Sequence, residues 1–163
     1  MINDVQALQF EAALETARAL QVPVCLMHMR GKPSNMQEAP SYGNVVDEVV
    51  SFLCKRIAAC EQQGILKHNI LVDPGIGFGK TLRHNLQLLA AIPDLKKTGA
   101  EVLIGVSRKS MIDDLLQRTV DQRMHASVGL AVQSVLNGAK IVRVHDVQAT
   151  YDAVRSAEAV VFS

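Results

Sequence analysis

The residues best suited to chemistry in this sequence follow short apolar runs. The most informative stretch is Val72-Asp73-Pro74-Gly75-Ile76-Gly77-Phe78-Gly79-Lys80-Thr81, whose three alternate glycines would let backbone approach a ligand closely. A tight turn from strand to helix would account for the glycines and for Pro74. It does not account for Asp73, because a carboxylate that ends an apolar strand is costly unless a donor in the protein or on a ligand pairs with it.

The same stretch nearly matches a phosphate-binding P-loop, because Gly79-Lys80-Thr81 precedes a predicted helix. Pro74 stands where the first glycine of that motif belongs, and Lys80 stands where the dinucleotide pattern G-x-G-x-x-G has its last glycine. A nucleotide-binding α/β module therefore remains an alternative hypothesis. It would require ATP binding that Lys80→Ala abolishes.

Two cations flanked by hydroxyls follow another apolar run, in Gly105-Val106-Ser107-Arg108-Lys109-Ser110. At a predicted helix start, this combination indicates an anion site. An exposed basic turn with Ser110 as the helix N-cap explains the pattern equally well.

Arg143-Val144-His145-Asp146 closes the last apolar run. Period-two alternation places Arg143 and His145 on one side of the strand, opposite Val142 and Val144, which we expect to be buried. A phosphate or pyrophosphate would satisfy both basic side chains. Asp146 is predicted to be the N-cap of the final helix.

Two weaker candidates lie earlier in the chain. His28 ends a strand and precedes a long loop, Gly31 to Gly43, and by itself it is more typical of a hydrogen-bonded strand end than of a catalyst. Asn3 and Asp4, by themselves, read as the cap of the first helix.

The elements that must position these residues alternate between strand and helix. Continuously apolar runs predict strands at 23–27, 69–72, 101–106 and 140–144, of the kind covered on both faces in parallel sheets. Apolar residues at three- and four-residue steps predict helices at 5–20, 44–63 (with Gly64 as a C-cap), 82 to Pro93, 121–137 and 147–161, besides a short helical stretch after Ser110.

This alternation predicts an α/β fold with right-handed crossovers, and two architectures fit it. Length favours a doubly wound open sheet, because a full (β/α)₈ TIM barrel needs roughly 250 residues. The strand ends favour part of a barrel, because polar side chains follow nearly every strand, as they do around a barrel mouth.

Composition excludes several kinds of partner. The 17 Lys and Arg residues balance 16 Asp and Glu, so we expect neither nucleic acid nor a membrane surface as a partner.

Cys25, Cys54 and Cys60 show no C-x-x-C spacing and are predicted to be buried free thiols. Because Met1 is followed by no signal-peptide pattern and no apolar run is long enough to span a membrane, we expect a soluble, cytoplasmic protein.

Taken together and in order, five motifs closely resemble the dihydropteroate synthase family along the whole chain. They are Ile2-Asn3-Asp4, Cys25-Leu26-Met27-His28-Met29, Leu71 to Lys80, Gly105 to Ser110, and Arg143 to Asp146. The family consists of (β/α)₈ barrel transferases of folate biosynthesis. They join 4-aminobenzoate to 6-hydroxymethyl-7,8-dihydropterin diphosphate and release pyrophosphate, and sulfonamides imitate the aminobenzoate.

The resemblance also implies roles for individual residues. Asn3 and Asp73 would hydrogen-bond the amino-pyrimidine edge of the pterin, and Lys109 would reach its carbonyl. Arg143 and His145 would bind the departing diphosphate. Lys109, Arg143 and His145 are thus the catalytic candidates, and neutralising charge on pyrophosphate should matter more than a strong general base.

The remaining implied contacts complete the substrate site. Ser110 would receive the aminobenzoate carboxylate, Phe78 and Met27 would line the pocket, and Gly105 belongs to the same binding set. Mg²⁺ is the expected helper ion, with no metal ligand expected among these residues, because the family's metal-associated asparagine lies in a loop that we do not find here.

Relative to the family, residues 1–163 are expected to form a single partial pterin-binding barrel domain, the C-terminal half, with Met1 inside the fourth strand and the first three strands missing. We therefore expect little or no synthase activity from the chain alone, and turnover near that of a full-length enzyme would contradict this.

Unpaired strand edges and the family's dimer helices predict a homodimer, which a monomer mass in light scattering would contradict. A non-catalytic truncated product that only dimerises remains an alternative, and the DNA upstream of Met1 would test it.

Overall fold

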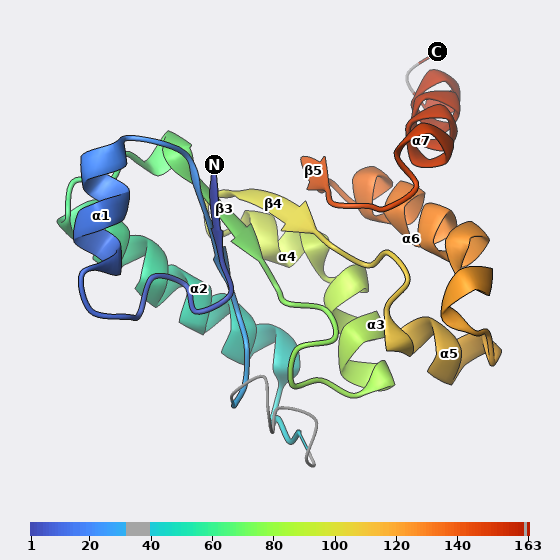
Figure 1. The fold of residues 1–163 in the computed structure, drawn as a ribbon, viewed down its shortest axis with the longest axis horizontal. Coiled ribbons are helices and arrows are strands. Elements are labelled where there is room, and N and C mark those ends of the chain that lie inside the picture. The colour runs from blue at the N-terminus through green and yellow to red at the C-terminus, as the bar shows by residue number, and fades with distance from the viewer. Residues whose placement is uncertain (32–39, 162) are drawn as a thin grey trace.

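The computed structural model describes residues 1–31, 40–161 and 163. Parallel strands alternate with helices from one end of the chain to the other (Figure 1). The elements are β1 (Ile2–Asp4), α1 (Ala13–Leu20), β2 (Val24–Met27), α2 (Val45–Gln62), η1 (Lys67–Asn69), β3 (Ile70–Asp73), α3 (Leu82–Ala90), α4 (Ile92–Lys96), β4 (Glu101–Ile104), α5 (Ser110–Leu116), η2 (Val120–Gln122), α6 (Met124–Leu136), β5 (Ile141–Val142) and α7 (Val147–Val161).

The sheet decides between the two predicted architectures. Its strand order is β1-β2-β3-β4-β5, with every neighbouring pair parallel. Each crossover advances by one strand, as in a (β/α)₈ barrel, whereas a doubly wound sheet reverses direction at a switch point. The chain therefore forms part of a TIM barrel, and the sheet built by the described residues stays open (Figure 1).

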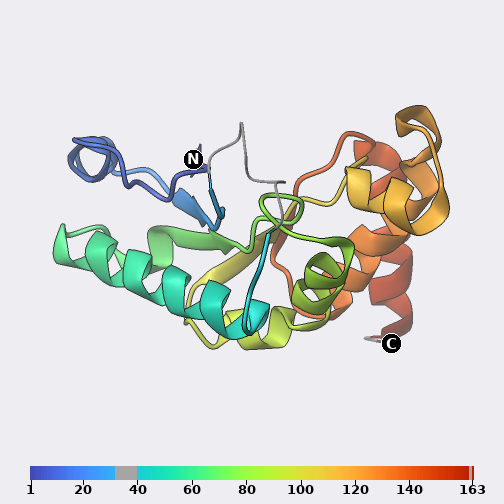
Figure 2. The ribbon, with the colours of Figure 1, turned by 90° about the horizontal axis from the view of Figure 1, so that it is seen from below.

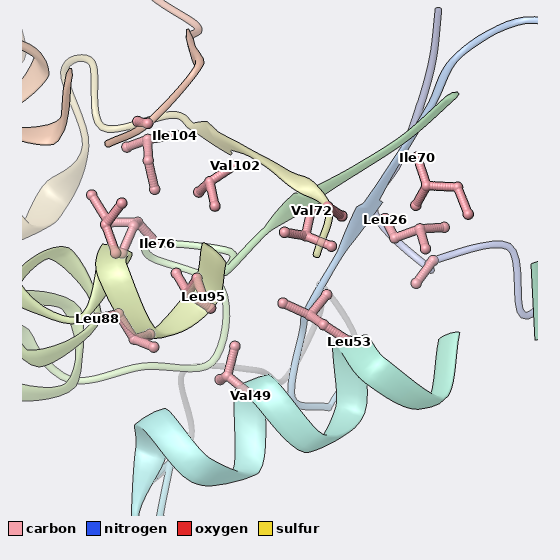
Figure 3. Close-up of a cluster of buried hydrophobic side chains, with 14 of the residues drawn as sticks. Leu26, Val49, Leu53, Ile70, Val72, Ile76, Leu88, Leu95, Val102 and Ile104 are labelled. Atoms are coloured by element: carbon pink, nitrogen blue, oxygen red, sulfur yellow. The ribbon is translucent and has the colours of Figure 1, made fainter. Parts of the chain in front are cut away.

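The main core lies between the sheet and the helices on its outer face, with α2, α3 and α4 on the same side (Figure 2). Figure 3 shows Val49 and Leu53 of α2 directed toward Leu26 and Val72 of the sheet, and all four are buried. The apolar spacing that predicted this helix is thus the spacing that packs it. Asn44 caps α2, because its side chain accepts hydrogen bonds from the amides of Val46 and Asp47.

A second, smaller cluster lies on the inner face of the sheet. It contains Cys25, Leu71 and Leu103 with Ile141 packed against them. Successive strand residues point to opposite faces, so the alternation that sends Leu26 and Val72 outward sends these residues inward. The inner face is the one that continues toward the polar strand ends.

The predicted helix at 5–20 is too long at its start, and Asn3 and Asp4 do not cap it. Residues 2–4 form strand β1, and the Asp4 carboxylate accepts hydrogen bonds from the amides of Gln6 and Leu8 in a turn. Ala7, Leu8 and Ala12 have positive φ angles, which a helix cannot contain. The helix begins at Ala13 because tight turns after β1 interrupt it.

Other predicted boundaries shift less. The strands predicted at 101–106 and 140–144 end at Ile104 and Val142, and Val144 is half-buried, as is Val142. The helix predicted at 121–137 divides into η2 and α6. Pro93 stands in the first turn of α4 rather than simply ending α3, since a proline is tolerated at a helix start. Most of the predicted loop at 31–43 lies outside the described residues.

The three cysteines differ in their exposure. Cys25 and Cys60 are buried free thiols, as predicted, but Cys54 is exposed on α2, so the prediction is wrong there. Within the described ranges, no helix combines the length and the apolar character needed to cross a bilayer.

Candidate active site

The inner face of the sheet collects the predicted site residues at its carboxyl-terminal edge. Asn3 pairs in register with Cys25, which lies in the inner cluster, so both share that face. The same period-two alternation places Asp73 beyond Leu71, Gly105 beyond Leu103, and Arg143 beyond Ile141. Met27 lies beyond Cys25 and is buried, in register with Asp73. Functional groups in a TIM barrel gather at this end of the strands.

Arg143 connects three strands at this edge. Its Nη2 donates to Asp73 Oδ2 over 3.3 Å, and its Nη1 donates to Asn3 Oδ1 over 3.2 Å. Asn3 lies in β1 and Arg143 directly follows β5, and these are the two outermost strands, so one side chain spans the mouth of a strongly curved sheet. Gly105 makes this path possible, because a Cβ there would lie 2.5 Å from Arg143 Nη2. The structure thus brings Asn3, Asp73, Gly105 and Arg143 together.

Asp73 is a carboxylate buried to 1 % exposure within this group. The Gly75 amide donates to Oδ1 over 2.7 Å, and Arg143 donates to Oδ2. Burial raises the pKa of Asp73, while the Gly75 amide, Lys109 and Arg143 oppose that rise. The protein itself thus supplies two of the donors that this buried carboxylate needs. The oxygens of Asp73 can accept further hydrogen bonds, and these are left for a ligand in the site.

Lys109 and Phe78 form the adjoining side. Lys109 Nζ lies 4.7 Å from the centroid of the Phe78 ring and donates to the Ile76 carbonyl oxygen. Burial lowers the pKa of Lys109 to about 8, with Asp73 opposing the shift and Arg143 reinforcing it. Phe78 is half-buried, so its ring still offers surface to a ligand. An ammonium over an aromatic face, close to a buried carboxylate, suits a flat polar heterocycle.

The turn after β4 sends consecutive cations in different directions. Arg108 has a φ of 57°, and its amide donates to Ser127 Oγ over 2.9 Å, while its carbonyl accepts from Arg123 Nη1 over 3.1 Å. Its guanidinium binds the Asp146 carboxylate through Nε and Nη2 over 3.2 and 2.6 Å. Arg108 thus turns toward the end of β5, while Lys109 turns toward β3.

The structure moves one of the two predicted caps and gives the carboxylate of the other a different partner. Ser110 is exposed and is the first residue of α5, with the extended Lys109 in the N-cap position, because the helix begins one residue earlier than predicted. Asp146 precedes α7, as expected, but its carboxylate is held by Arg108. An ion pair at 2.6 Å offers that carboxylate a stronger donor than a helix amide.

His145 is exposed and is positioned by Ser107, a contact that the sequence analysis missed. Ser107 Oγ accepts from the His145 amide over 3.2 Å and lies 2.9 Å from Nδ1. With one lone pair taken by the amide, the hydroxyl can donate to Nδ1 and leave a proton on Nε2 for a ligand oxygen. Counting in steps of two from Leu103 through Gly105 would have placed Ser107 on the inner face.

Lys80 does not act as a P-loop lysine. It is 3 % exposed, and its Nζ lies 3.0 Å from Nδ1 of His28, on the neighbouring strand end. A P-loop lysine must reach phosphates, whereas this one points into the protein. Nothing in the local sequence pairs the two residues, because 52 positions separate them.

The described part of the chain brings together no group of three or more His, Cys, Asp or Glu side chains that could hold a metal ion. Asp73, the one carboxylate deep in the site described above, is already engaged by Gly75 and Arg143. The residues here do not fit a protein-held Mg²⁺, so magnesium stays a prediction and no chemical step is derived from it.

Comparison with known proteins assigns the chain to a family. The family described as "Pterin binding enzyme" matches residues 1–145. The chain belongs to the pterin-binding enzyme family. Dihydropteroate synthases are among the pterin-binding enzymes most similar to it. The Escherichia coli K12 enzyme is 47 % identical over 98 % of this chain, and the Haemophilus influenzae enzyme is 50 % identical over 95 %.

Solved structures of pterin-binding enzymes share the fold. The Yersinia pestis dihydropteroate synthase in a sulfonamide complex superposes with a TM-score of 0.95 at 45 % identity, covering 98 % of this chain and 58 % of its own. The Xanthomonas albilineans enzyme with 7,8-dihydropteroate gives 0.92 at 47 % identity, covering 98 % of this chain and 57 % of its own. The chain spans 56 % of the length of the two curated relatives above.

Proposed function

We propose that this chain carries the pterin and diphosphate subsites of a dihydropteroate synthase. The enzyme would condense 6-hydroxymethyl-7,8-dihydropterin diphosphate with 4-aminobenzoate and release pyrophosphate. The observation that carries the proposal is the convergence of Asn3, Asp73 and Arg143 on one edge of the inner face, joined by hydrogen bonds. Membership of the pterin-binding family supports it.

Recognition of the heterocycle would fall to the buried side of the site. The free lone pairs of Asp73 would accept hydrogen bonds from the amino-pyrimidine edge, together with the Asn3 amide, and the Lys109 ammonium would donate to the ring carbonyl. Phe78 and Met27 would supply the apolar lining. A buried carboxylate is suited to this task because a ligand without the matching N–H donors would leave the desolvation of the carboxylate uncompensated.

Departure of pyrophosphate would depend on the exposed side. Arg143 uses one N–H of each terminal nitrogen on Asn3 and Asp73, which leaves further guanidinium donors for phosphate oxygens. Nε2 of His145 would add a second donor. These groups would stabilise the charge that develops as the carbon–oxygen bond to the diphosphate breaks and the amine of 4-aminobenzoate attacks the methylene. Ser110 at the start of α5 would receive the aminobenzoate carboxylate.

The proposal extends to Mg²⁺ as a helper ion, to a cytoplasmic location and to a homodimer. Three free cysteines support a reducing compartment. Exposed apolar side chains on α7 support self-association, namely Val147, Tyr151, Val160 and Val161. Light scattering tests the dimer, and a monomer mass would contradict it.

The test is calorimetric binding of the pterin diphosphate to the 163-residue chain. We expect Asp73→Asn to weaken binding about 100-fold, because it removes charged acceptors from a buried site. The matched control is Asp94→Asn, whose exposed carboxylate pairs with Lys97 far from the strand ends.

Equal affinity of wild type and Asp73→Asn would refute the proposed subsite. Because the described sheet is open, we expect these residues to bind the pterin yet form little dihydropteroate when both substrates are supplied. Turnover near that of a full-length enzyme would contradict that expectation.

A further inference from the structure

Lys80 is a buried cation to which the proposed function assigns no role. Its ammonium has three acceptors in reach: Nδ1 of His28 at 3.0 Å, the Phe78 carbonyl at 3.0 Å and the His28 carbonyl at 3.4 Å. An ammonium carries three N–H donors and no acceptor, so the three contacts match its full capacity. A lysine held in this way stabilises the positions of the two backbone segments that carry His28 and Phe78.

The acceptors belong to two segments that are far apart in sequence. His28 ends β2, whereas Phe78 lies in the turn after β3. The His28 ring packs edge-on against Phe52, with centroids 5.0 Å apart. Burial, with Lys80 and Arg30 as further causes, lowers the pKa of His28 to about 3, so its ring is neutral. With Nδ1 accepting from Lys80, the ring proton must be on Nε2.

The two segments also touch through backbone. Gly75 has a φ of 70°, and a Cβ there would lie 1.9 Å from the His28 carbonyl oxygen. At Gly79, where φ is 66°, a Cβ would lie 2.5 Å from the Arg30 carbonyl oxygen. The Tyr42 hydroxyl donates to the Gly79 carbonyl over 2.8 Å. The glycines therefore allow the turn at 74–79 to lie directly on the end of β2, and Lys80 fastens it there.

We propose that Lys80 is a positioning residue that fixes the turn at 74–79 against the end of β2. The turn carries two groups that the proposed function needs in place, the Phe78 ring and the Ile76 carbonyl that receives Lys109. Without the ammonium, the Phe78 carbonyl and His28 Nδ1 lose their donor, and the turn can move away from β2. The inference rests on the proposed function for its consequence in binding, but not for the contact itself.

The charged groups around Lys80 fit this role. Asp73 attracts the ammonium and Lys109 repels it, while burial lowers the pKa of Lys80 to about 7. The neutral His28 ring adds no competing charge. Loss of the Lys80 proton would leave two donors for three acceptors, which loosens the turn as the pH rises.

The first test compares Lys80→Met with wild type. We expect the variant to bind the pterin diphosphate about tenfold more weakly, because the three acceptors lose their donor. Backbone amides at 76–79 should exchange with deuterium faster, with amides in α2 unchanged. Lys97→Met, which alters an exposed lysine paired with Asp94, should match wild type in both measurements. Wild-type affinity and exchange in Lys80→Met would overturn the inference.

A second measurement needs neither a folded variant nor a ligand. Long-range proton–nitrogen NMR on the wild-type chain should show His28 with a proton on Nε2 and an accepting Nδ1 at pH 6, and an amine-reactive label should modify Lys97 but not Lys80. A proton on Nδ1, or equal labelling of the two lysines, would overturn the inference. Failure of wild type to bind the pterin diphosphate would refute the proposed function alone, since amide exchange, NMR and labelling would still test Lys80.

Discussion

The two sides of the candidate site differ in how their polar groups are held. At the ends of β2 and β3, Asp73 and Lys80 are 1 % and 3 % exposed, and each is surrounded by partners. At the end of β5, Arg143 has 43 % of its side chain exposed, and His145 is exposed as well. β2 and β3 lie inside the sheet and are covered by helices, whereas β5 is a two-residue edge strand. The ends of β2 and β3, with Asp73, Lys80 and the turn at 74–79, thus form a rigid side of the site, here called the buried wall. The edge strand supplies the exposed side, Arg143 and His145, whose side chains can adjust to a ligand.

This difference suits the two halves of the proposed substrate. A flat heterocycle is recognised by fixed donors and acceptors, for which a preorganised, buried wall is efficient. A diphosphate is recognised mainly by charge, and exposed cations on longer side chains can follow it. We therefore expect changes to the buried wall to cost both stability and pterin affinity, and changes to the exposed side to cost diphosphate affinity alone.

The largest expected effect is on the buried wall. Gly75→Ala places a Cβ 1.9 Å from the backbone oxygen of His28, where no side-chain movement can relieve the clash. We expect the free energy of unfolding to fall by about 3 kcal/mol, because both the clash and the positive φ oppose alanine. Urea denaturation measures this.

Gly129→Ala is the matched control, since nothing lies within 4 Å of a Cβ at that position in α6. It should raise stability by about 0.5 to 1 kcal/mol through helix propensity. Equal effects of the two substitutions would show that the wall is not rigid.

An intermediate effect concerns Lys109, which joins the two sides. Its pKa is lowered to about 8, and only the protonated form can donate to a ring carbonyl as an ammonium. Pterin affinity should fall as the pH rises through 8, by up to about tenfold per pH unit, beyond the smaller decrease that loss of the Lys80 proton causes near pH 7. Calorimetric titrations from pH 6.5 to 9.5 measure the profile. Lys109→Arg should remove the fall near pH 8 and keep the smaller one near pH 7, and a fall near pH 8 that persists in that variant would assign that titration to another group.

The smallest expected effect is on the exposed side. Ser107→Ala removes the hydroxyl that holds the amide and Nδ1 of His145, and it should weaken diphosphate binding by about 1 kcal/mol. Affinity for a pterin without diphosphate should stay the same, which separates the two sides. Ser156→Ala on α7 is the control, because its hydroxyl donates to the Asp152 carbonyl of its own helix. A loss of affinity for both ligands would mean that the two sides are not independent.

Sequence reasoning predicted most elements because they depend on local periodicity, and the resemblance to the family supplied the set of site residues. The strands at 24–27 and 70–73 and the helix at 45–62 were predicted to within one residue, whereas the strands predicted at 101–106 and 140–144 end two residues earlier in the structure. Alternation was applied only to the last strand, where it placed Arg143 on the same side as His145; in the structure Arg143 turns to Asp73 and Asn3, while His145 is exposed beside Ser107. The start of α1 was missed, because apolar spacing continues through residues that the turns after β1 hold at positive φ.

The sequence by itself determined the α/β class, the strand ends that carry chemistry and the requirement that Asp73 find a donor. Tertiary structure alone decided which donor that is, that Lys80 turns to His28 rather than outward, and that Ser107 holds His145. The physical reason is that periodicity fixes the face from which a side chain leaves its strand. The partner that it meets depends on strand order and sheet curvature, which bring Asn3 and Arg143 within 3.2 Å across 140 residues of chain.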